Sequence, residues 1–134
     1  MKEIVVFLTI AVFFCLSNSS ADAEERKDPH KPHQHQHPEY AKIKNPIAKT
    51  EKSVAEGRKL YEKHCIACHG EAGKGGIGPG LRVPGRIHGS TDGEMFHVIA
   101  DGVAGTAMKG FGNDLSVEMR WHLVNYITRL RKSK

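Results

Sequence analysis

The chain has few cysteines and no long hydrophobic run. Three cysteines occur in 134 residues, and one of them, Cys15, lies in a segment that we expect to be removed. The longest apolar run, residues 4–16, would span about 20 Å as a helix, against about 30 Å for the hydrocarbon core of a membrane. The two remaining cysteines lack the second ligand pair of a zinc site. We therefore expect neither a structural zinc site nor a stable membrane insertion.

Signals for binding nucleotides or nucleic acid are also missing. The glycine-rich stretch 75–80 has no strand before it and no Lys-Ser/Thr pair after it, so it does not match a phosphate-binding loop. Residues 70–89 are dense in glycine and proline, which predicts irregular structure there. The chain carries no recognisable nucleic-acid-binding motif, so nucleic acid is not an expected partner.

The N-terminus has the three-part layout of a secretory signal peptide. Lys2 gives a short positive start, the apolar run follows, and Ala21-Asp22-Ala23 offers a cleavage site of small residues. Residues 1–23 are thus predicted to direct export, which places the mature chain in the periplasm. Their removal leaves 19 basic and 13 acidic residues, a net charge of +6. This balance favours acidic partners or anionic surfaces.

Residues 24–52 are predicted to form a flexible leader. Its first 26 residues, 24–49, are polar and rich in proline and histidine, with almost no apolar side chains to bury. Four histidines follow one another closely, at positions 30, 33, 35 and 37. They could bind copper, nickel or zinc weakly, but a solvated linker is the favoured interpretation because no carboxylate or cysteine completes a defined ligand set.

One five-residue motif carries the chemistry of this chain. Cys65-Ile66-Ala67-Cys68-His69 has the spacing of a c-type haem attachment site. Each cysteine can add across one haem vinyl group, and the imidazole of His69 can then bind the iron from one face. A thioredoxin-type redox pair would need a βαβ context, and none surrounds the motif. We predict one haem c, attached through Cys65 and Cys68.

Residues 53–134 are predicted to form one small helical domain around that haem. Ser53 with Glu56, and Thr91 with Glu94, match capping boxes that begin two helices, and a third helix is expected after Ser116. About 82 residues bury little apolar surface on their own. A haem inside the domain would supply part of the missing core.

The second iron ligand is predicted to be Met108. Six side chains outside the motif could bind iron: Met95, Met108, Met119, His88, His97 and His122. Four of them fall within predicted helices, where a core or surface role is more common. Met108 lies in a segment of small residues, 105–112, that would let its thioether approach the iron without backbone clashes. His88 is the alternative.

In this order, the motifs resemble those of class I cytochromes c of the small bacterial periplasmic type. The matching elements cover nearly all of the domain: Gly57 and Tyr61, Cys65 to His69, Gly78-Pro79-Gly80-Leu81, Gly105-Thr106-Ala107-Met108, and residues 121–127.

The resemblance implies an all-α fold of three to four helices around one covalently bound haem. It also implies that Gly57 lets the first helix approach Trp121 and Tyr126 on the last one. The Pro79 carbonyl would accept a hydrogen bond from Nδ1 of His69, and Leu81 would pack on the haem. Many relatives have proline after the ligand methionine, whereas Lys109 stands here, which predicts a more mobile loop.

His/Met ligation closes both faces of the iron, so the chain is expected to carry electrons rather than to act as an enzyme. Basic side chains flank the haem-binding segments and could steer redox partners with acidic docking surfaces: Lys59, Lys63, Lys74, Arg82, Arg86 and Lys109. Arg82 or Arg86 could instead pair with a haem propionate. The alternatives are a haem-based sensor, a redox subunit of a dehydrogenase or oxidase complex, or a metal-handling protein that uses its histidine-rich leader.

Overall fold

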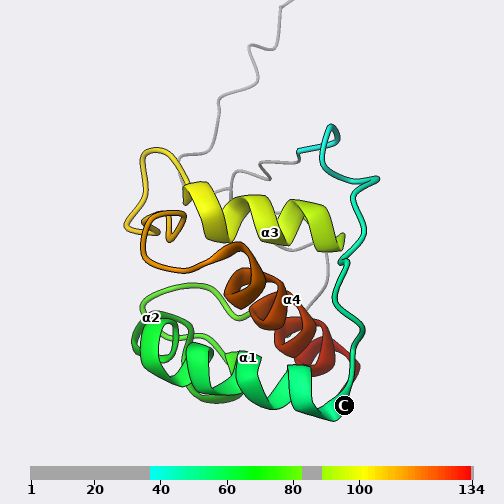
Figure 1. Ribbon diagram of the computed structural model, residues 1–134. Helices are drawn as coiled ribbons and strands as arrows, with labels where there is room; N and C mark the ends of the chain where they lie inside the picture. The colour runs from blue at the N-terminus through cyan, green and yellow to red at the C-terminus, as the bar shows by residue number, and fades with distance from the viewer. Residues whose placement is uncertain (1–36, 83–88, 134) are drawn as a thin grey trace, which may run out of the picture.

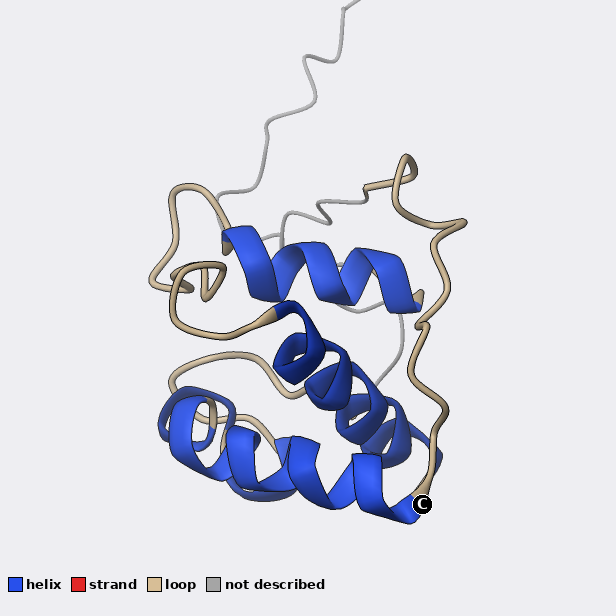
Figure 2. Cartoon of the chain, viewed as in Figure 1, coloured by secondary structure: helices blue, strands red, loops and turns tan. Residues whose placement is uncertain are grey.

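The described part of the chain folds entirely into helices and loops. A computed structural model describes residues 37–82 and 89–133. The predicted signal peptide, the first three histidines of the leader, Arg86 and His88 lie outside these residues. The elements are listed in chain order: α1 (Glu51–His64), α2 (Ile66–His69), the 3-10 turn η1 (Glu71–Gly73), α3 (Asp92–Asp101) and α4 (Val117–Lys132). Within the described residues the β-structure is limited to an isolated bridge between Gly102 and Lys109, so the prediction of an all-α domain is confirmed (Figure 2).

Helix α1 begins earlier than its sequence predicts. The side chain of Thr50 accepts a hydrogen bond from the backbone N–H of Ser53, which makes Thr50 the N-cap. Ser53 is therefore inside the first turn, and its hydroxyl lies 2.8 Å from Nδ1 of His122 in α4. Glu56 pairs with Lys59 instead of reaching back to cap the helix. The predicted capping box at Ser53 is wrong because the helix already begins at Glu51, where Thr50 caps it by accepting the backbone N–H of Ser53 itself.

The beginnings of α3 and α4 agree with the sequence prediction. Thr91 and Glu94 form both hydrogen bonds of a capping box at the start of α3. Ser116 caps α4 by accepting the backbone N–H of Met119. Helix α3 ends at Asp101, where Gly102 takes a positive φ of 75°. These ends are readable from sequence because short polar side chains satisfy the first free N–H groups and glycine tolerates the left-handed exit.

The domain is organised around the crossing of α1 and α4, which lies beside α3 (Figure 1). Gly57 is buried in the middle of α1, and a Cβ atom there would lie 2.8 Å from Cβ of Tyr126. It would also overlap the backbone carbonyl group of His122. Only glycine lets the two helices come this close. The predicted approach to Tyr126 is present, whereas Trp121 turns the other way and stacks on Phe96 of α3, with ring centres 4.0 Å apart.

Buried apolar side chains from α1, α3, α4 and the loop before α4 form a continuous core. Tyr61 and Tyr126 face each other across the helix crossing with ring centres 5.3 Å apart. Twelve residues make up the cluster: Val54, Tyr61, Met95, Ile99, Phe111, Leu115, Trp121, Leu123, Val124, Tyr126, Ile127 and Leu130. Half-buried Leu81, Cys65 and Met108 pack against it. The core therefore reaches the haem motif and the predicted ligand loop.

The last part of the predicted leader packs against the helices. Asn45 donates from its side chain to the carbonyl of Trp121 and to Oδ1 of Asn125, each at 3.0 Å. Asn125 is almost fully buried and donates in turn to the carbonyl of Ile47 at 3.1 Å and to Oγ of Ser53 at 2.8 Å. Composition alone suggested a flexible leader up to residue 52. The structure differs over residues 37–50, which we call the strap. Backbone and amide hydrogen bonds hold this segment in place, together with Ile47, which packs against the core.

Replacing Asn45 by alanine is expected to lower the free energy of unfolding by about 1–3 kcal/mol. The change removes both hydrogen bonds to α4 and leaves the buried Oδ1 of Asn125 without its donor. Thermal unfolding followed by circular dichroism measures the effect. Lys44→Ala is the control, because Lys44 is exposed on the same segment. Equal stability of the two variants would mean that the strap does not contribute to folding.

Candidate haem site

The two motif cysteines lie where α1 passes into α2. Cys65 stands between the two helices, as the C-cap of α1 and the N-cap of the four-residue helix α2. The backbone N–H groups of Cys68 and His69 donate to its carbonyl at 3.2 and 2.9 Å. Both thiols are free. Cys65 is half-buried against the core, while Cys68 is exposed. Burial, aided by the neighbouring Cys68, raises the pKa of the Cys65 thiol to about 11. One helical turn thus presents two unoxidised sulphur atoms and one imidazole together.

The loop after the motif folds back onto it through backbone hydrogen bonds. The N–H groups of Gly75 and Gly78 donate to the carbonyls of His69 and Cys68, each at 2.8 Å. Gly70 has a φ of 73°, which lets the chain reverse directly after His69. The hydroxyl of Tyr61 donates to the Gly70 carbonyl at 2.8 Å, and burial raises the pKa of Tyr61 to about 12. The loop that the sequence predicts as irregular is therefore tied to α1 and α2 at defined points.

The imidazole of His69 is held in one orientation. Its Nδ1 lies 2.8 Å from the Pro79 carbonyl, which is the contact that the family resemblance implies. Because a carbonyl can only accept, Nδ1 carries the proton and donates it to Pro79. His69 is buried, with 8% of the residue's surface exposed. Nε2 is then the nitrogen that keeps a lone pair for a metal ion.

Met108 lies in a short, backbone-bonded loop between α3 and α4. Its carbonyl accepts from the Val103 N–H at 2.9 Å, and its own N–H donates to Oγ1 of Thr106 at 3.2 Å. The residue is half-buried and packs against the core cluster. Lys109 pairs with Asp114 at 3.0 Å and lies over the ring of Phe111, 5.0 Å from its centre. These contacts anchor the position at which many relatives have proline.

The other candidate iron ligands have different surroundings. Met95 is part of the buried core, and Met119 is 43% exposed on α4. His97 pairs with Asp101, and His122 contacts Ser53. His88 lies outside the described residues. Among the described candidates, Met108 combines partial burial with a loop position.

Two further residues bear on how the site would hold a haem. Leu81 is half-buried against the core, and its carbonyl accepts from Nε of Arg131 at 3.1 Å. Arg82, the next residue, has a buried Nε without a hydrogen-bond partner among the described residues. A buried guanidinium nitrogen left without an acceptor is costly. A haem propionate would provide that acceptor, so the chemistry of this donor fits the proposed cofactor.

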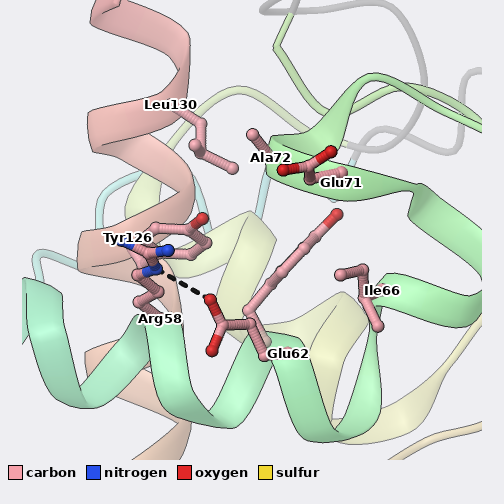
Figure 3. Close-up of a pocket in the computed structure, with 8 residues that line it drawn as sticks. Arg58, Glu62, Ile66, Glu71, Ala72, Tyr126 and Leu130 are labelled. Atoms are coloured by element: carbon pink, nitrogen blue, oxygen red, sulfur yellow. Dashed lines mark hydrogen bonds and ion pairs between the residues drawn. The ribbon is translucent and has the colours of Figure 1, made fainter.

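A shallow pocket lies on another side of α1 and was not foreseen from the sequence. Figure 3 shows Arg58 and Glu62 paired across its mouth, with a distance of 2.7 Å between Nε and Oε1. Its remaining lining comes from α1, α2, η1 and α4: Tyr61, Ile66, Glu71, Ala72, Tyr126 and Leu130. None of the predicted iron ligands lines it. Ile66 is the one lining residue inside the Cys65–His69 motif, and the packing of four elements brings the lining together.

Comparisons with known proteins agree with this geometry. Residues 52–127 match the family model described as "Cytochrome C oxidase, cbb3-type, subunit III". Cytochrome c-551 of Bacillus subtilis (strain 168) is 33% identical over 76 residues, which cover 55% of this chain and 65% of the relative. The chain thus spans slightly less than two thirds of that relative.

Two solved structures share the fold. Cytochrome cL from Hyphomicrobium denitrificans superposes with a TM-score of 0.52 at 29% identity, over 60% of this chain and 49% of the other. Cytochrome c6 from the diatom Phaeodactylum tricornutum gives a TM-score of 0.52 at 24% identity, over 60% of this chain and 95% of its own. The second comparison bears on the fold alone. The chain therefore belongs to the cytochrome c family that the matching model describes, as a class I, single-haem member with the all-helical cytochrome c fold.

Proposed function

We propose that this protein is a periplasmic one-electron carrier whose single haem c is attached through Cys65 and Cys68. The observation that carries the proposal is the orientation of His69. His69 lies on the same short turn as both cysteines, and its Nδ1 donates a hydrogen bond to the Pro79 carbonyl. Nε2 is therefore available as the iron ligand. When bound, haem c supplies an iron that alternates between the ferric and ferrous states.

Two residues of this chain would hold that iron. Nε2 of His69 and the thioether of Met108 would be its ligands. With both in place no position would remain for a substrate, and electron transfer needs no group that moves a proton. The thioether favours the ferrous state and so raises the reduction potential. A haem propionate would accept from the buried Nε of Arg82.

The proposed location follows from the N-terminal sequence. Residues 1–23 have the layout of a signal peptide, and c-type haem is attached outside the bacterial cytoplasm. Within residues 37–82 and 89–133, no helix is long and apolar enough to cross a membrane. The partners we propose are therefore exported redox proteins.

The face beside the attachment motif suits brief contact with an acidic partner. Lys63 and Lys74 are exposed and flank the motif in the sequence, and neither forms an ion pair with another described residue. Exposed Cys68 and Ile77 lie in the same segment, and Ile77 is 90% exposed. Lys59 and Lys109 are partly neutralised by Glu56 and Asp114. The charges that steer a partner are then mainly those of Lys63 and Lys74.

Met108→Ala is expected to abolish the methionine-to-iron absorption band of the ferric protein and to lower the reduction potential, because the thioether no longer stabilises ferrous iron. Absorption spectra and redox titration measure both effects. The haem should remain attached after acid-acetone extraction, since the thioether bonds of Cys65 and Cys68 are untouched.

Met119→Ala is the matched control, because Met119 is an exposed methionine on α4. It should keep both the band and the potential. If Met108→Ala keeps the wild-type spectrum, another residue is the second iron ligand, and His88 is the first to test. Haem that extracts freely from the wild type would refute covalent attachment.

Lys74→Glu is expected to slow electron transfer to an acidic redox partner at low salt, and the difference from wild type should shrink as salt shortens the Debye length to about 10 Å at 0.1 M. Stopped-flow rates against ionic strength measure this. Lys52→Glu makes the same charge change near the other end of α1, about 20 Å along the helix from Cys65, and should have a smaller effect. Equal slowing by both variants, at an unchanged reduction potential, would argue for attraction by net charge without a docking face.

A further inference from the structure

Two histidines from distant parts of the sequence meet where the strap crosses α3. His37, at the start of the described chain, and His97, in the middle of α3, have ring centres 4.5 Å apart. Tyr40 stacks on the ring of His97, with ring centres 3.9 Å apart and an interplanar angle of 17°. The site is built from residues that the proposed haem chemistry does not use.

Each of these imidazoles has a carboxylate at the same ring nitrogen. Nδ1 of His97 lies 2.8 Å from Oδ2 of Asp101, one turn further along α3. Nδ1 of His37 lies 3.4 Å from Oε1 of Glu39. A carboxylate at Nδ1 favours the tautomer with the proton on that nitrogen, which leaves the lone pair on Nε2 for a metal ion. Histidines that bind zinc in proteins commonly have such a partner.

The spacing and exposure of the pair also suit a shared ion. With Zn–N distances of about 2.0–2.1 Å, two imidazoles on one tetrahedral ion have ring centres about 5 Å apart, close to the spacing observed here. The side chains of His37 and His97 are 29% and 20% exposed, so an ion can reach them from solvent.

The backbone of His37 is held at this place independently of any ion. Burial opposes ionisation of Glu94, but hydrogen bonds from Thr91, Ser90 and the backbone N–H of His37 hold the pKa of Glu94 below its usual range. The ionised carboxylate therefore ties the beginning of the strap to the first turn of α3. The approach of His37 to His97 is prepared by the fold.

We propose that His37 and His97 bind one divalent cation of the zinc and copper class through their Nε2 atoms. Within residues 37–82 and 89–133, no three histidine, cysteine or carboxylate side chains converge to hold a metal, so the described residues supply two ligands. Water molecules complete the shell. Imidazole nitrogen suits this class of metal.

The experiment is a calorimetric titration of the haem-loaded mature protein with Zn2+ at pH 7.5, where neutral imidazole predominates. Zinc is the probe because it has no redox chemistry of its own and leaves the haem iron in its starting state. The wild type should bind about one zinc ion per chain. His97→Gln and His37→Gln should each weaken binding about tenfold or more, and Asp101→Asn should weaken it less, as expected for an orienting carboxylate.

His64→Gln is the matched control, because His64 packs against Phe111 instead of the histidine pair, and it should bind zinc as the wild type does. Unfolding temperatures with and without zinc give a second readout: zinc should stabilise the wild type and not His97→Gln. Wild-type affinity in His97→Gln would overturn the proposal and assign zinc binding to the leader histidines alone. Absence of zinc binding in the wild type would leave the pair as an ordinary packing contact and would equally overturn it.

Discussion

The close crossing of α1 and α4 at Gly57 is the constraint on which the rest of the structure depends. Because no side chain stands between Gly57 and the backbone at His122, the two helices approach until Tyr61 and Tyr126 pack across the crossing. Tyr61 then reaches the Gly70 carbonyl and ties the end of the haem motif to α1. A helix contact at Gly57 thus decides where the Cys65–His69 turn lies.

Buried polar groups also stabilise the crossing of α1 and α4. Asn125, buried in α4, joins Ser53 of α1 to Asn45 and Ile47 of the strap. Buried amides of this kind favour a unique arrangement, because any shift would leave donors and acceptors without partners. The strap continues to α3, where Tyr40 and His37 meet His97. The N-terminal segment therefore belongs to the packed domain and carries a site of its own.

Some structural features were predictable because they depend on neighbours in the chain. The capping of α3 by Thr91 and of α4 by Ser116 needs only residues within three positions. The start of α1 was misplaced because two side chains, Thr50 and Ser53, could each cap, and Ser53 is used by His122 from another helix. The packing of residues 37–50 was missed for a related reason: the segment has little to bury, and its hydrogen-bond partners lie about 80 residues away.

For the site, the amino-acid sequence by itself determined the motif: the two thiols and the imidazole of the proposed haem attachment all lie within five residues, as Cys-x-x-Cys-His. The tertiary structure decided what surrounds that turn. It brings the Pro79 carbonyl to His69, leaves the buried Nε of Arg82 without a hydrogen-bond partner among residues 37–82 and 89–133, and pairs Lys109 with Asp114. It also joins His37 to His97, residues that no local pattern connects. Residues for covalent attachment can be recognised from a short motif because they are neighbours in the chain. Ligand orientation, charge compensation and the second histidine site depend on segments that are distant in the sequence and meet only when the chain packs.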